Sequence, residues 1–335
     1  MSDPHPHPYD SEDSDDSDDS DDYSSSMGYD GCPDRPTSPL PSPSLPEAKH
    51  TLSSHGLSLG EDVASITYSD PSARAEIEGL LQQQIPFVVR GAGSEELPMG
   101  WDDAFWEERY GDRVVACNAR HKDAQELLLS WYLEIARSAE QDTRLYLRNL
   151  HLLEDFPDLL RDDDARGNAM FPPSVLTPPL LPNLLPVLEE EEEGISISPA
   201  WIEWVELFIS GIGTRTPLFH VDVCSTHAWS GQIQGRKRFF VAPPSATPHI
   251  YPDPHNPSIS SIRQPDRPNL DTYPEYAHVP LSVVDLDPGD ILFIPPKYWH
   301  AAVTLTSPSI TVAGNFVNAL NRASFLHDLQ TSTCM

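Results

Sequence analysis

The stretch HVDVCSTHAWSGQIQGRKRFF, residues 220–240, has the composition of two short β-strands joined by a glycine turn. Because side chains alternate between the two faces of a strand, His220 and Asp222 are expected to point the same way. Buried together without a partner, an imidazole and a carboxylate would lose several kcal/mol of solvation. The stretch is therefore either an ordinary strand pair with polar edges or one wall of a metal site.

Short strands of the same kind are predicted throughout the chain after Gly194. Each is rich in Val, Ile, Phe or Trp, and Gly, Pro and Asp turns separate them. The segments are WIEWVELFIS, TPLFHVDV, AWSGQIQG, RKRFFVAPP, SVVDLDPGD, ILFIPP, WHAAVTLTS and SITVAGNFVN. This spacing predicts a mainly β core, a sandwich or jelly roll, over residues 195–320. Residues 321–335 are expected to form a C-terminal helix or tail, which either mediates a homodimer or simply packs on the core.

Residues 59–194 are expected to form an α/β segment that precedes this core. ARAEIEGLLQQQ, residues 73–84, spaces apolar side chains at helical intervals, and IPFVVRGAG then has the pattern of a buried strand. A second helix is predicted at about 124–138, where Asp123 and Glu126 have the spacing of a capping box. Its predicted apolar stripe consists of Leu128, Trp131 and Ile135.

Two segments have the composition of irregular chain. Residues 1–58 are rich in Asp, Ser and Pro, and they hold too few apolar side chains to offset the entropy of ordering, so a disordered acidic tail is predicted. Residues 171–188 are crowded with Pro and Leu, and the glutamates at 189–193 follow, which together predict a solvated loop. In the tail, an acidic-directed kinase is a possible partner acting on Ser14, Ser17 and Ser20.

The overall charge and the cysteines limit the classes of function. The chain has 335 residues with 52 acidic and 21 basic side chains, a net charge of -31, which disfavours direct binding to nucleic acid or to a membrane surface. No apolar run approaches the ~18 residues of a membrane span. The four cysteines form no C-x-x-C pair, so no zinc cluster is predicted. An intracellular protein, nuclear or cytoplasmic, is expected.

A further histidine is needed for a metal site, because an H-x-D triplet alone carries little information. The chain has a second triplet at 121–123, but there Asp123 is explained as a helix cap. Two histidines and one carboxylate on one side of a metal are the set that binds iron(II) with positions left open. His300 in PPKYWHAAV is the best third ligand, because it follows a turn and starts a predicted strand. The other candidates have less regular contexts: His227, His249, His255 and His278.

Lys237 is expected to point inward from the strand RKRFFV. Alternation places Arg236 and Arg238 on one face, and if these are solvated, Lys237 lies on the other. An inward ammonium needs an anion, and a dicarboxylate whose other end chelates the metal would suit it. The alternative is an exposed lysine that protects a hairpin edge.

Together these residues resemble the Jumonji-C family of cupin-like iron(II)- and 2-oxoglutarate-dependent oxygenases. The resemblance is loose over residues 60–320 and closer over 216–241 and 286–316. It is carried by HVDVCSTHAWSGQIQGRKRFF and DLDPGDILFIPPKYWHAAV, with GWDDAFWEERYGDR and RLYLRNLHLLEDFP similar to the family's earlier segments. It implies a double-stranded β-helix, the jelly roll of the cupins.

The resemblance also implies roles for individual residues. His220, Asp222 and His300 would bind Fe(II), Lys237 would pair with the distal carboxylate of the cosubstrate 2-oxoglutarate, and O2 would be consumed. Tyr146 and Asn315 would line the cosubstrate pocket, together with Thr216. Two positions depart from the family pattern: Pro217 stands where threonine is frequent, one residue after Thr216, and Ser230 stands where asparagine is usual.

The function implied is a dioxygenase that hydroxylates a protein side chain. Removal of N-methyl groups from histones or other proteins by the same chemistry is the first alternative. A non-catalytic, cupin-fold interaction protein is the second, and a metal-dependent cupin enzyme that does not use 2-oxoglutarate is the third. The four convergent polar groups argue against the non-catalytic scaffold, which has no physical need of them.

Overall fold

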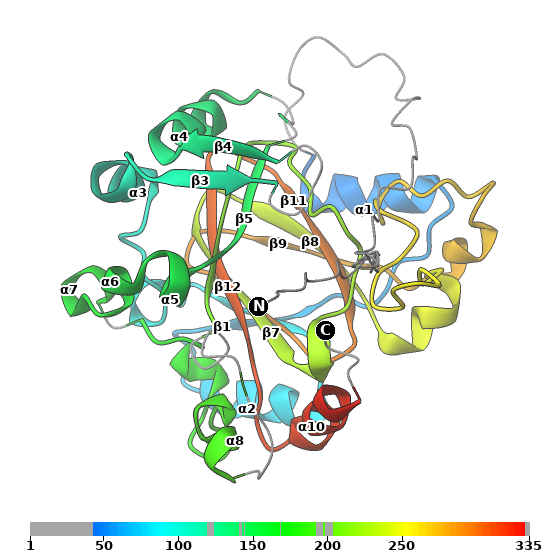
Figure 1. The fold of residues 1–335 in the computed structure, drawn as a ribbon. Helices are drawn as coiled ribbons and strands as arrows, with labels where there is room; N and C mark the ends of the chain where they lie inside the picture. Colours follow the sequence, from blue (N-terminus) through cyan, green and yellow to red (C-terminus); the bar gives the residue numbers. More distant parts are fainter. Residues whose placement is uncertain are drawn as a thin grey trace, which may run out of the picture. The chain divides into compact units, whose positions relative to one another are not determined.

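The computed structural model describes residues 43–118, 124–140, 143, 145–167, 169–191, 197 and 204–331. Its centre consists of two β-sheets (Figure 1). The larger sheet has the order β1 (Ala64–Thr67), β2 (Phe87–Arg90), β10 (Ile291–Ile294), β7 (His227–Gln234), β12 (Ser309–Phe316), β6 (Glu206–Ser210) and β5 (Tyr146–His151). The smaller has the order β11 (Trp299–Thr304), β8 (Lys237–Ala242) and β9 (Ser282–Leu286).

The two sheets enclose a shared apolar interior. The side chains that meet there come from both sheets: Val88, Ala228, Leu292 and Ile294 from the larger, and Phe239, Val241, Val284, Leu286 and Ala302 from the smaller. The chain crosses repeatedly between the sheets, because β7, β10 and β12 belong to the larger sheet and β8, β9 and β11 to the smaller. This arrangement confirms the predicted jelly roll with flanking helices.

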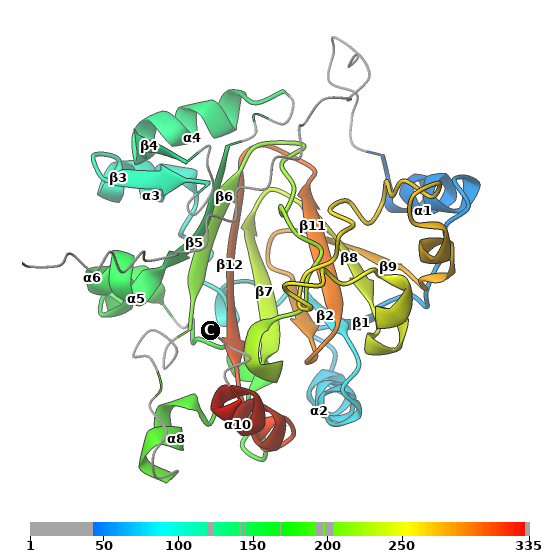
Figure 2. The same cartoon turned by 45° about the vertical axis from the view of Figure 1, so that its right-hand side comes forward.

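Helices pack on the outer face of the larger sheet, outside the strands (Figure 2). On β2 the alternation is direct, because Phe87 and Val89 face the helices while Val88 faces the interior. The predicted helix at 73–84 and the strand after it are confirmed as α2 (Ala73–Gln83) and β2. Since β1 and β2 join β10 in one sheet, the α/β segment and the β core share their main sheet. No helix in the described ranges combines the length and the hydrophobicity that crossing a membrane requires.

The remaining helical elements are short. They are α3 (Asp103–Tyr110), α4 (Leu129–Ser138), α5 (Leu152–Asp155), α6 (Pro157–Leu160), α7 (Asp163–Arg166), α8 (Leu185–Glu191) and α10 (Arg322–Gln330), with 3-10 turns at Gly93–Glu95, Ser174–Leu176, Val223–Ser225, Pro244–His249 and Pro274–His278. Helix α10 was predicted as a helix or tail. The solvated loop predicted at 171–193 is wrong where α8 and the turn at Ser174–Leu176 form, because Leu185 and Leu188 find a buried cluster with Phe325 of α10.

The predicted helix at 124–138 starts too early. Its first residues form β4 (Gln125–Leu128), which pairs with β3 (Val114–Cys117), and α4 begins at Leu129. Pairing with β3, the strand that precedes it in the chain, outweighs the local capping pattern. Asp123 itself lies outside the described residues. The helix also turns a different face inward, since Trp131 of the predicted stripe is 59% exposed. The buried side chains are Leu129, Tyr132, Leu133 and Ala136.

The predicted disordered tail is wrong for its last part. Residues 45–54 form the helix α1 (Leu45–Ser54), which packs beside β9 and buries Ala48 and Leu52. A capping box between Ser44 and Glu47 begins the helix. Composition missed the helix because only two of its apolar side chains, Ala48 and Leu52, are buried. Residues 1–42, with the proposed kinase sites, lie outside the described residues.

Leu52→Ala should lower the free energy of unfolding by about 2–4 kcal/mol, as truncations of buried leucine do. Leu52 is 3% exposed and packs in a cluster with side chains such as Phe240 and Trp299. Chemical denaturation would measure the change, with His50→Ala on the exposed side of α1 as the control. Equal stability of the two variants would mean that α1 does not dock.

Candidate metal centre

Three predicted ligands, His220, Asp222 and His300, converge in the structure. The Nε2 atom of His220 lies 4.0 Å from Oδ1 of Asp222, and Nε2 of His300 lies 3.7 Å from Oδ2 of the same carboxylate. One ligand atom from each residue lies within 4.8 Å of the other two. Among the described residues, this is the only group of three or more His, Cys, Asp or Glu side chains placed in this way.

The backbone sets the spacing of the two histidines. His300 lies in β11, and His220 bonds to it in both directions, with N–O distances of 2.8 and 3.2 Å. On the other side of the chain, Phe219 and Trp299 are fully buried with ring centres 5.8 Å apart. The apolar anchors on one face thus hold the two imidazoles side by side on the other, with ring centres 4.4 Å apart.

The segment that carries His220 and Asp222 is extended but is not a strand of either sheet. His220 makes only isolated bridges, to Ile259 and His300, and a 3-10 turn begins at Val223. The predicted strand TPLFHVDV is therefore wrong as a regular ladder. Pro217 has no N–H to donate to such a ladder. The alternation of side chains is nevertheless kept, so His220 and Asp222 still share a side.

Each imidazole is oriented by a backbone carbonyl. Nδ1 of His220 lies 3.3 Å from the oxygen of Leu218, and Nδ1 of His300 lies 3.1 Å from that of Tyr298. A proton on each Nδ1 leaves the lone pair of Nε2 directed at Asp222. Burial, together with the charge of His300, lowers the pKa of His220 to about 4, so its imidazole is neutral near pH 7.

The turn after Asp222 is held by the C-terminal helix. Cys224 and Ser225 both have positive φ, 51° and 52°, which is unfavourable for residues other than glycine. The hydroxyl of Ser225 donates to Asp328 of α10 at 2.5 Å, and the amide of Asn321 donates to the Ser225 carbonyl at 3.0 Å. The position of Asp222 therefore depends on α10.

These three residues fit a divalent metal. Two imidazoles and one carboxylate on one side of an ion are the facial set typical of non-haem iron(II), and they leave positions for other ligands. The convergence also explains why the carboxylate can lie between two histidines without an Arg or Lys partner in the described part of the chain.

Lys237 points into the same interior. It is 3% exposed, and its Nζ lies 3.5 Å from the hydroxyl of Tyr146 and 5.6 Å from the ring centres of Tyr146 and Phe208. Among the described residues no carboxylate pairs with it. Burial lowers the pKa of this ammonium to about 7 and raises the pKa of Tyr146, so the Tyr146 hydroxyl keeps its proton and can donate to an anion.

Further hydroxyl groups surround Lys237. Thr304 lies opposite it across β8 and β11, and its hydroxyl bonds to that of Ser210 at 2.7 Å. The hydroxyl of Thr214 is buried without a hydrogen-bond partner in the described part of the chain. Lys237, with the Tyr146 hydroxyl beside it and Thr304 opposite, forms a polar cluster that suits one carboxylate. Sequence analysis missed Thr304 and Ser210, which the register of the two sheets would have indicated.

Two other predicted pocket residues are engaged elsewhere. The hydroxyl of Thr216 donates to the carbonyl of Ala302 and accepts from its N–H, so it serves the β11 backbone. The amide of Asn315 donates to the hydroxyl of Thr226 at 2.8 Å, and Asn315 faces the interior from β12. Ser230, on the adjacent β7, faces the same interior opposite Ala313.

The inward direction of Lys237 was predicted on a partly wrong assumption. Arg238 is not solvated: it is 3% exposed and donates two hydrogen bonds to Asp285, at 2.6 and 2.8 Å. Arg236 is the more exposed of the two arginines. The irregular context predicted for His227 is also wrong, because His227 begins the strand β7 and is fully buried. Its Nε2 lies 3.2 Å from the side-chain oxygen of Asn318.

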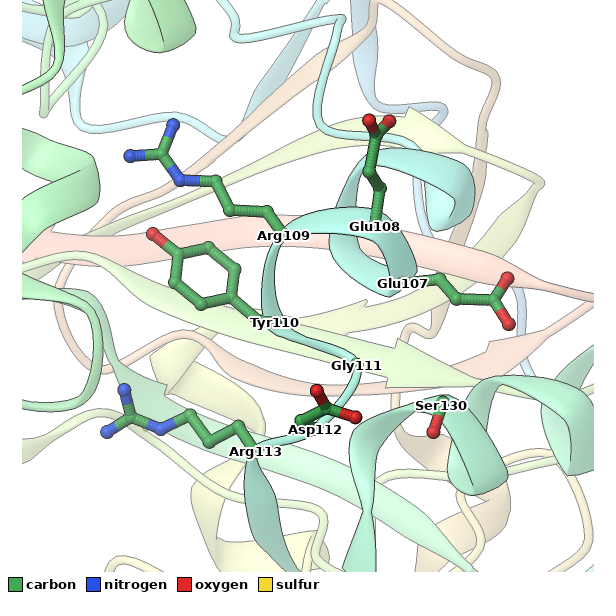
Figure 3. Close-up of a pocket in the computed structure, with 8 residues that line it drawn as sticks. All are labelled: Glu107, Glu108, Arg109, Tyr110, Gly111, Asp112, Arg113 and Ser130. Carbon is green, nitrogen blue, oxygen red and sulfur yellow. The ribbon is translucent and has the colours of Figure 1, made fainter.

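A hollow of about 370 Å³ lies away from these residues, at the end of α3 (Figure 3). The residues that line it are Glu107, Glu108, Arg109, Tyr110, Gly111, Asp112, Arg113 and Ser130. Arg109 is paired with Asp158 and Asp162, and Arg113 lies over the ring of Phe156. The two arginines of this hollow therefore have structural partners, and none of its lining residues belongs to the metal centre.

The chain is similar in sequence to a domain family and to several known proteins. The cupin-like domain family matches residues 72–321. HSPB1-associated protein 1 of Rattus norvegicus is 32% identical over 109 residues, which are 32% of this chain and 22% of that protein. The 2-oxoglutarate and iron-dependent oxygenase JMJD4 of Mus musculus is 24% identical over 282 residues, 76% of this chain and 60% of that protein. The arginine-specific demethylase JMJ20 of Arabidopsis thaliana is 24% identical over 226 residues, 65% and 46% of the two chains. The chain thus spans less than two thirds of the length of these relatives.

Proposed function

Because the chain belongs to the family of cupin-like domains, we propose that it is an iron(II)- and 2-oxoglutarate-dependent oxygenase that hydroxylates a protein side chain. The observation that carries the proposal is the shared interior of two sites. The triad of His220, Asp222 and His300 and the buried ammonium of Lys237 open into one space between the sheets. The name of the mouse relative JMJD4 supports the same cofactors.

The residues of the chain would have two roles, metal binding and cosubstrate binding. His220, Asp222 and His300 hold iron(II) through two nitrogens and one oxygen. Lys237 and Tyr146 bind the distal carboxylate of 2-oxoglutarate, whose other end then reaches the metal. With iron(II) bound, one oxygen atom of O2 would enter succinate and the other a C–H bond of the substrate, with release of CO2.

The apolar side chains between the two sites exclude water. Phe239, Val241 and Ala302 face the interior beside Lys237 and His300, and each is at most 9% exposed. Low polarity strengthens the attraction between the ammonium and a carboxylate. It also keeps the reacting centre apart from solvent. The protein would thus supply orientation and a dry pocket.

N-methyl removal is the second candidate, and the name of the plant relative, arginine-specific demethylase JMJ20, favours it. Both reactions begin with oxidation of a C–H bond at the same centre. A protein partner is proposed in either case, and the rat relative is named for association with another protein. Mass spectrometry separates the two, since hydroxylation adds one oxygen to the product and demethylation removes one CH2 and yields formaldehyde.

The test is an anaerobic titration with iron(II) followed by 2-oxoglutarate. Wild-type protein should develop a visible metal-to-ligand charge-transfer band, which requires 2-oxoglutarate to chelate bound iron(II). His220→Ala should show no band, while His255→Ala, an exposed histidine outside the triad, should match the wild type. A folded wild-type protein without the band would overturn the oxygenase and leave two functions, the interaction protein and the cupin enzyme that does not use 2-oxoglutarate.

A further inference from the structure

The turn after Asp222 contains a covalent bond as well as hydrogen bonds. Cys224 is disulfide-bonded, whereas Cys117, which is buried in the outer core cluster, is a free thiol. The sequence has two further cysteines, Cys32 and Cys334, and both lie outside the described residues. The partner of Cys224 is therefore one of these two.

Cys224 lies against the C-terminal half of α10. Its side chain is 4% exposed and packs in a cluster with Phe325 of that helix, which Leu329 also contacts. The hydroxyl of the next residue, Ser225, donates to Asp328 in the last turn of α10. Cys224 is therefore close to the part of the helix from which the chain continues to its last residues.

The length of chain beyond α10 suits a bond from Cys224 to Cys334. The described part of the chain ends at Thr331, directly after α10, and Cys334 follows three positions later. Three residues span at most about 11 Å, and the Cα atoms of a disulfide lie about 4.4–6.8 Å apart. Because Thr331 continues from the helix turn that bonds to Ser225, Cys334 is tethered within a short distance of Cys224.

Cys32 is the less suitable partner. The described chain begins at Pro43 and leads into α1, which packs beside β9. Figures 1 and 2 both show α1 well away from α10. The residues between Cys32 and Pro43 would have to bridge this separation, and the entropy lost on closing a loop grows with its length.

We propose that Cys224 and Cys334 form a reversible disulfide, which fastens α10 to the turn after Asp222 so that oxidation of the two thiols strengthens metal binding. The effect on the metal rests on the proposed function, whereas the bond itself does not. Cys224 and Ser225 have positive φ, a conformation that persists only where the surrounding structure imposes it. A covalent link from Cys224 to the end of α10 imposes it directly, and Asp222 is then held two residues away.

The bond forms by exchange with a small disulfide, oxidised glutathione. The thiolate of one cysteine attacks the glutathione disulfide and releases one glutathione thiolate, and the second protein thiolate then attacks the mixed disulfide and releases the other. The two protein thiols lose two protons and two electrons in total, and oxidised glutathione is reduced to two molecules of glutathione. A thiol reductant reverses both steps, so the bond responds to the ratio of the two forms of glutathione.

The bond is tested first by mass spectrometry of the full chain. The chain is equilibrated with excess oxidised glutathione, its remaining thiols are alkylated, and it is digested with trypsin without reduction. Wild-type protein should give one cross-linked pair of peptides that contains Cys224 and Cys334, and a reductant should separate the pair. Cys32→Ser, the matched control, should give the same pair, and Cys334→Ser should give none. A link from Cys224 to Cys32, or Cys224 bound only to glutathione or left as a free thiol, would overturn the inference.

The effect on the metal is tested with manganese(II), which replaces iron(II) without redox chemistry. Oxidised wild-type protein should bind manganese(II) about 10-fold more tightly than protein treated with a phosphine reductant, since outer support of a metal ligand contributes about 10–100-fold. Its midpoint of thermal unfolding should be higher by about 4 °C or more, because the bond closes a long loop. In Cys334→Ser the reductant should change neither value. Equal manganese(II) affinity of oxidised and reduced wild-type protein would overturn the control of the metal site.

The charge-transfer band separates the disulfide from the proposed function. The cross-linked pair of peptides in a folded protein that develops no band would refute the oxygenase alone. A band of equal strength in oxidised and reduced protein, together with no cross-linked pair, would refute the disulfide alone.

Discussion

Lys237→Met will weaken the binding of 2-oxoglutarate by about 30-fold or more, because truncating one partner of a buried charge pair costs about 2–5 kcal/mol. The buried ammonium lies beside the Tyr146 hydroxyl, and Thr304, whose hydroxyl bonds to that of Ser210, lies opposite it. Methionine fills a similar volume without the charge. The fold should therefore survive while the anion loses its partner.

Lys237 should also make the binding of 2-oxoglutarate depend on pH. Burial lowers the pKa of Lys237 from the ordinary 10.5 to about 7, so the folded, ligand-free protein binds fewer protons than the unfolded chain between these values. The contribution of Lys237 to stability therefore rises across that window, and below pH 7 the buried charge is at its most unfavourable. A bound carboxylate needs the protonated form, so affinity should fall by up to about tenfold per pH unit above pH 7.

Isothermal titration with 2-oxoglutarate at pH 6.5, 7.5 and 8.5, with a redox-inert divalent ion in place of iron, would measure two effects. These are the loss of affinity in Lys237→Met and the fall of wild-type affinity with rising pH. Lys297→Met removes an exposed lysine and should leave affinity and its pH dependence unchanged. Tight binding by Lys237→Met, or an affinity that is flat with pH in the wild type, would show that the carboxylate binds elsewhere.

Asp222→Ala should abolish turnover and lower the affinity for iron(II) by more than about 100-fold, since even the loss of an outer-shell partner of a ligand costs 10–100-fold. The carboxylate is the only anionic member of the triad, and it lies within 4.0 Å of both imidazoles. Stability without metal should change little, because the variant also removes a half-buried charge that has no cation beside it.

Equilibrium dialysis against iron(II) under anaerobic conditions, with thermal unfolding of the same samples, separates metal binding from folding. Asp271→Ala, an exposed aspartate in the loop before β9, is the matched control. Iron(II) retained by Asp222→Ala at wild-type affinity would show that the triad is not the metal site.

The metal triad could be predicted because the signals for it lie in short stretches of sequence. Alternation alone places His220 and Asp222 on one side, and the turn before β11 singles out His300. The same alternation puts Glu206 and Phe208 of WIEWVELFIS on one face, because Leu207 and Ile209 pack on the other.

Other features depended on partners far along the chain. Arg238 looked like a solvated arginine, and its buried partner Asp285 lies 47 residues away. Helix α1 was concealed in a segment whose composition is that of a tail, because its docking depends on two side chains and the surface of β9. The start of α4 depended on a nearer partner, because the pairing of β4 with the preceding strand β3 outweighed a good capping pattern.

The hydrogen bonds between α10 and the turn after Asp222 determine when, during synthesis and folding, the metal site can form. Ser225 and Asp328 lie 103 residues apart, so the turn leaves the ribosome long before the helix that fixes it. Domains fold as units once their parts have been synthesised. A nascent chain without α10 would carry both His220 and Asp222 yet lack the support that positions the carboxylate. Iron would then bind only after the chain has folded, and incomplete chains would not hold a reactive metal ion.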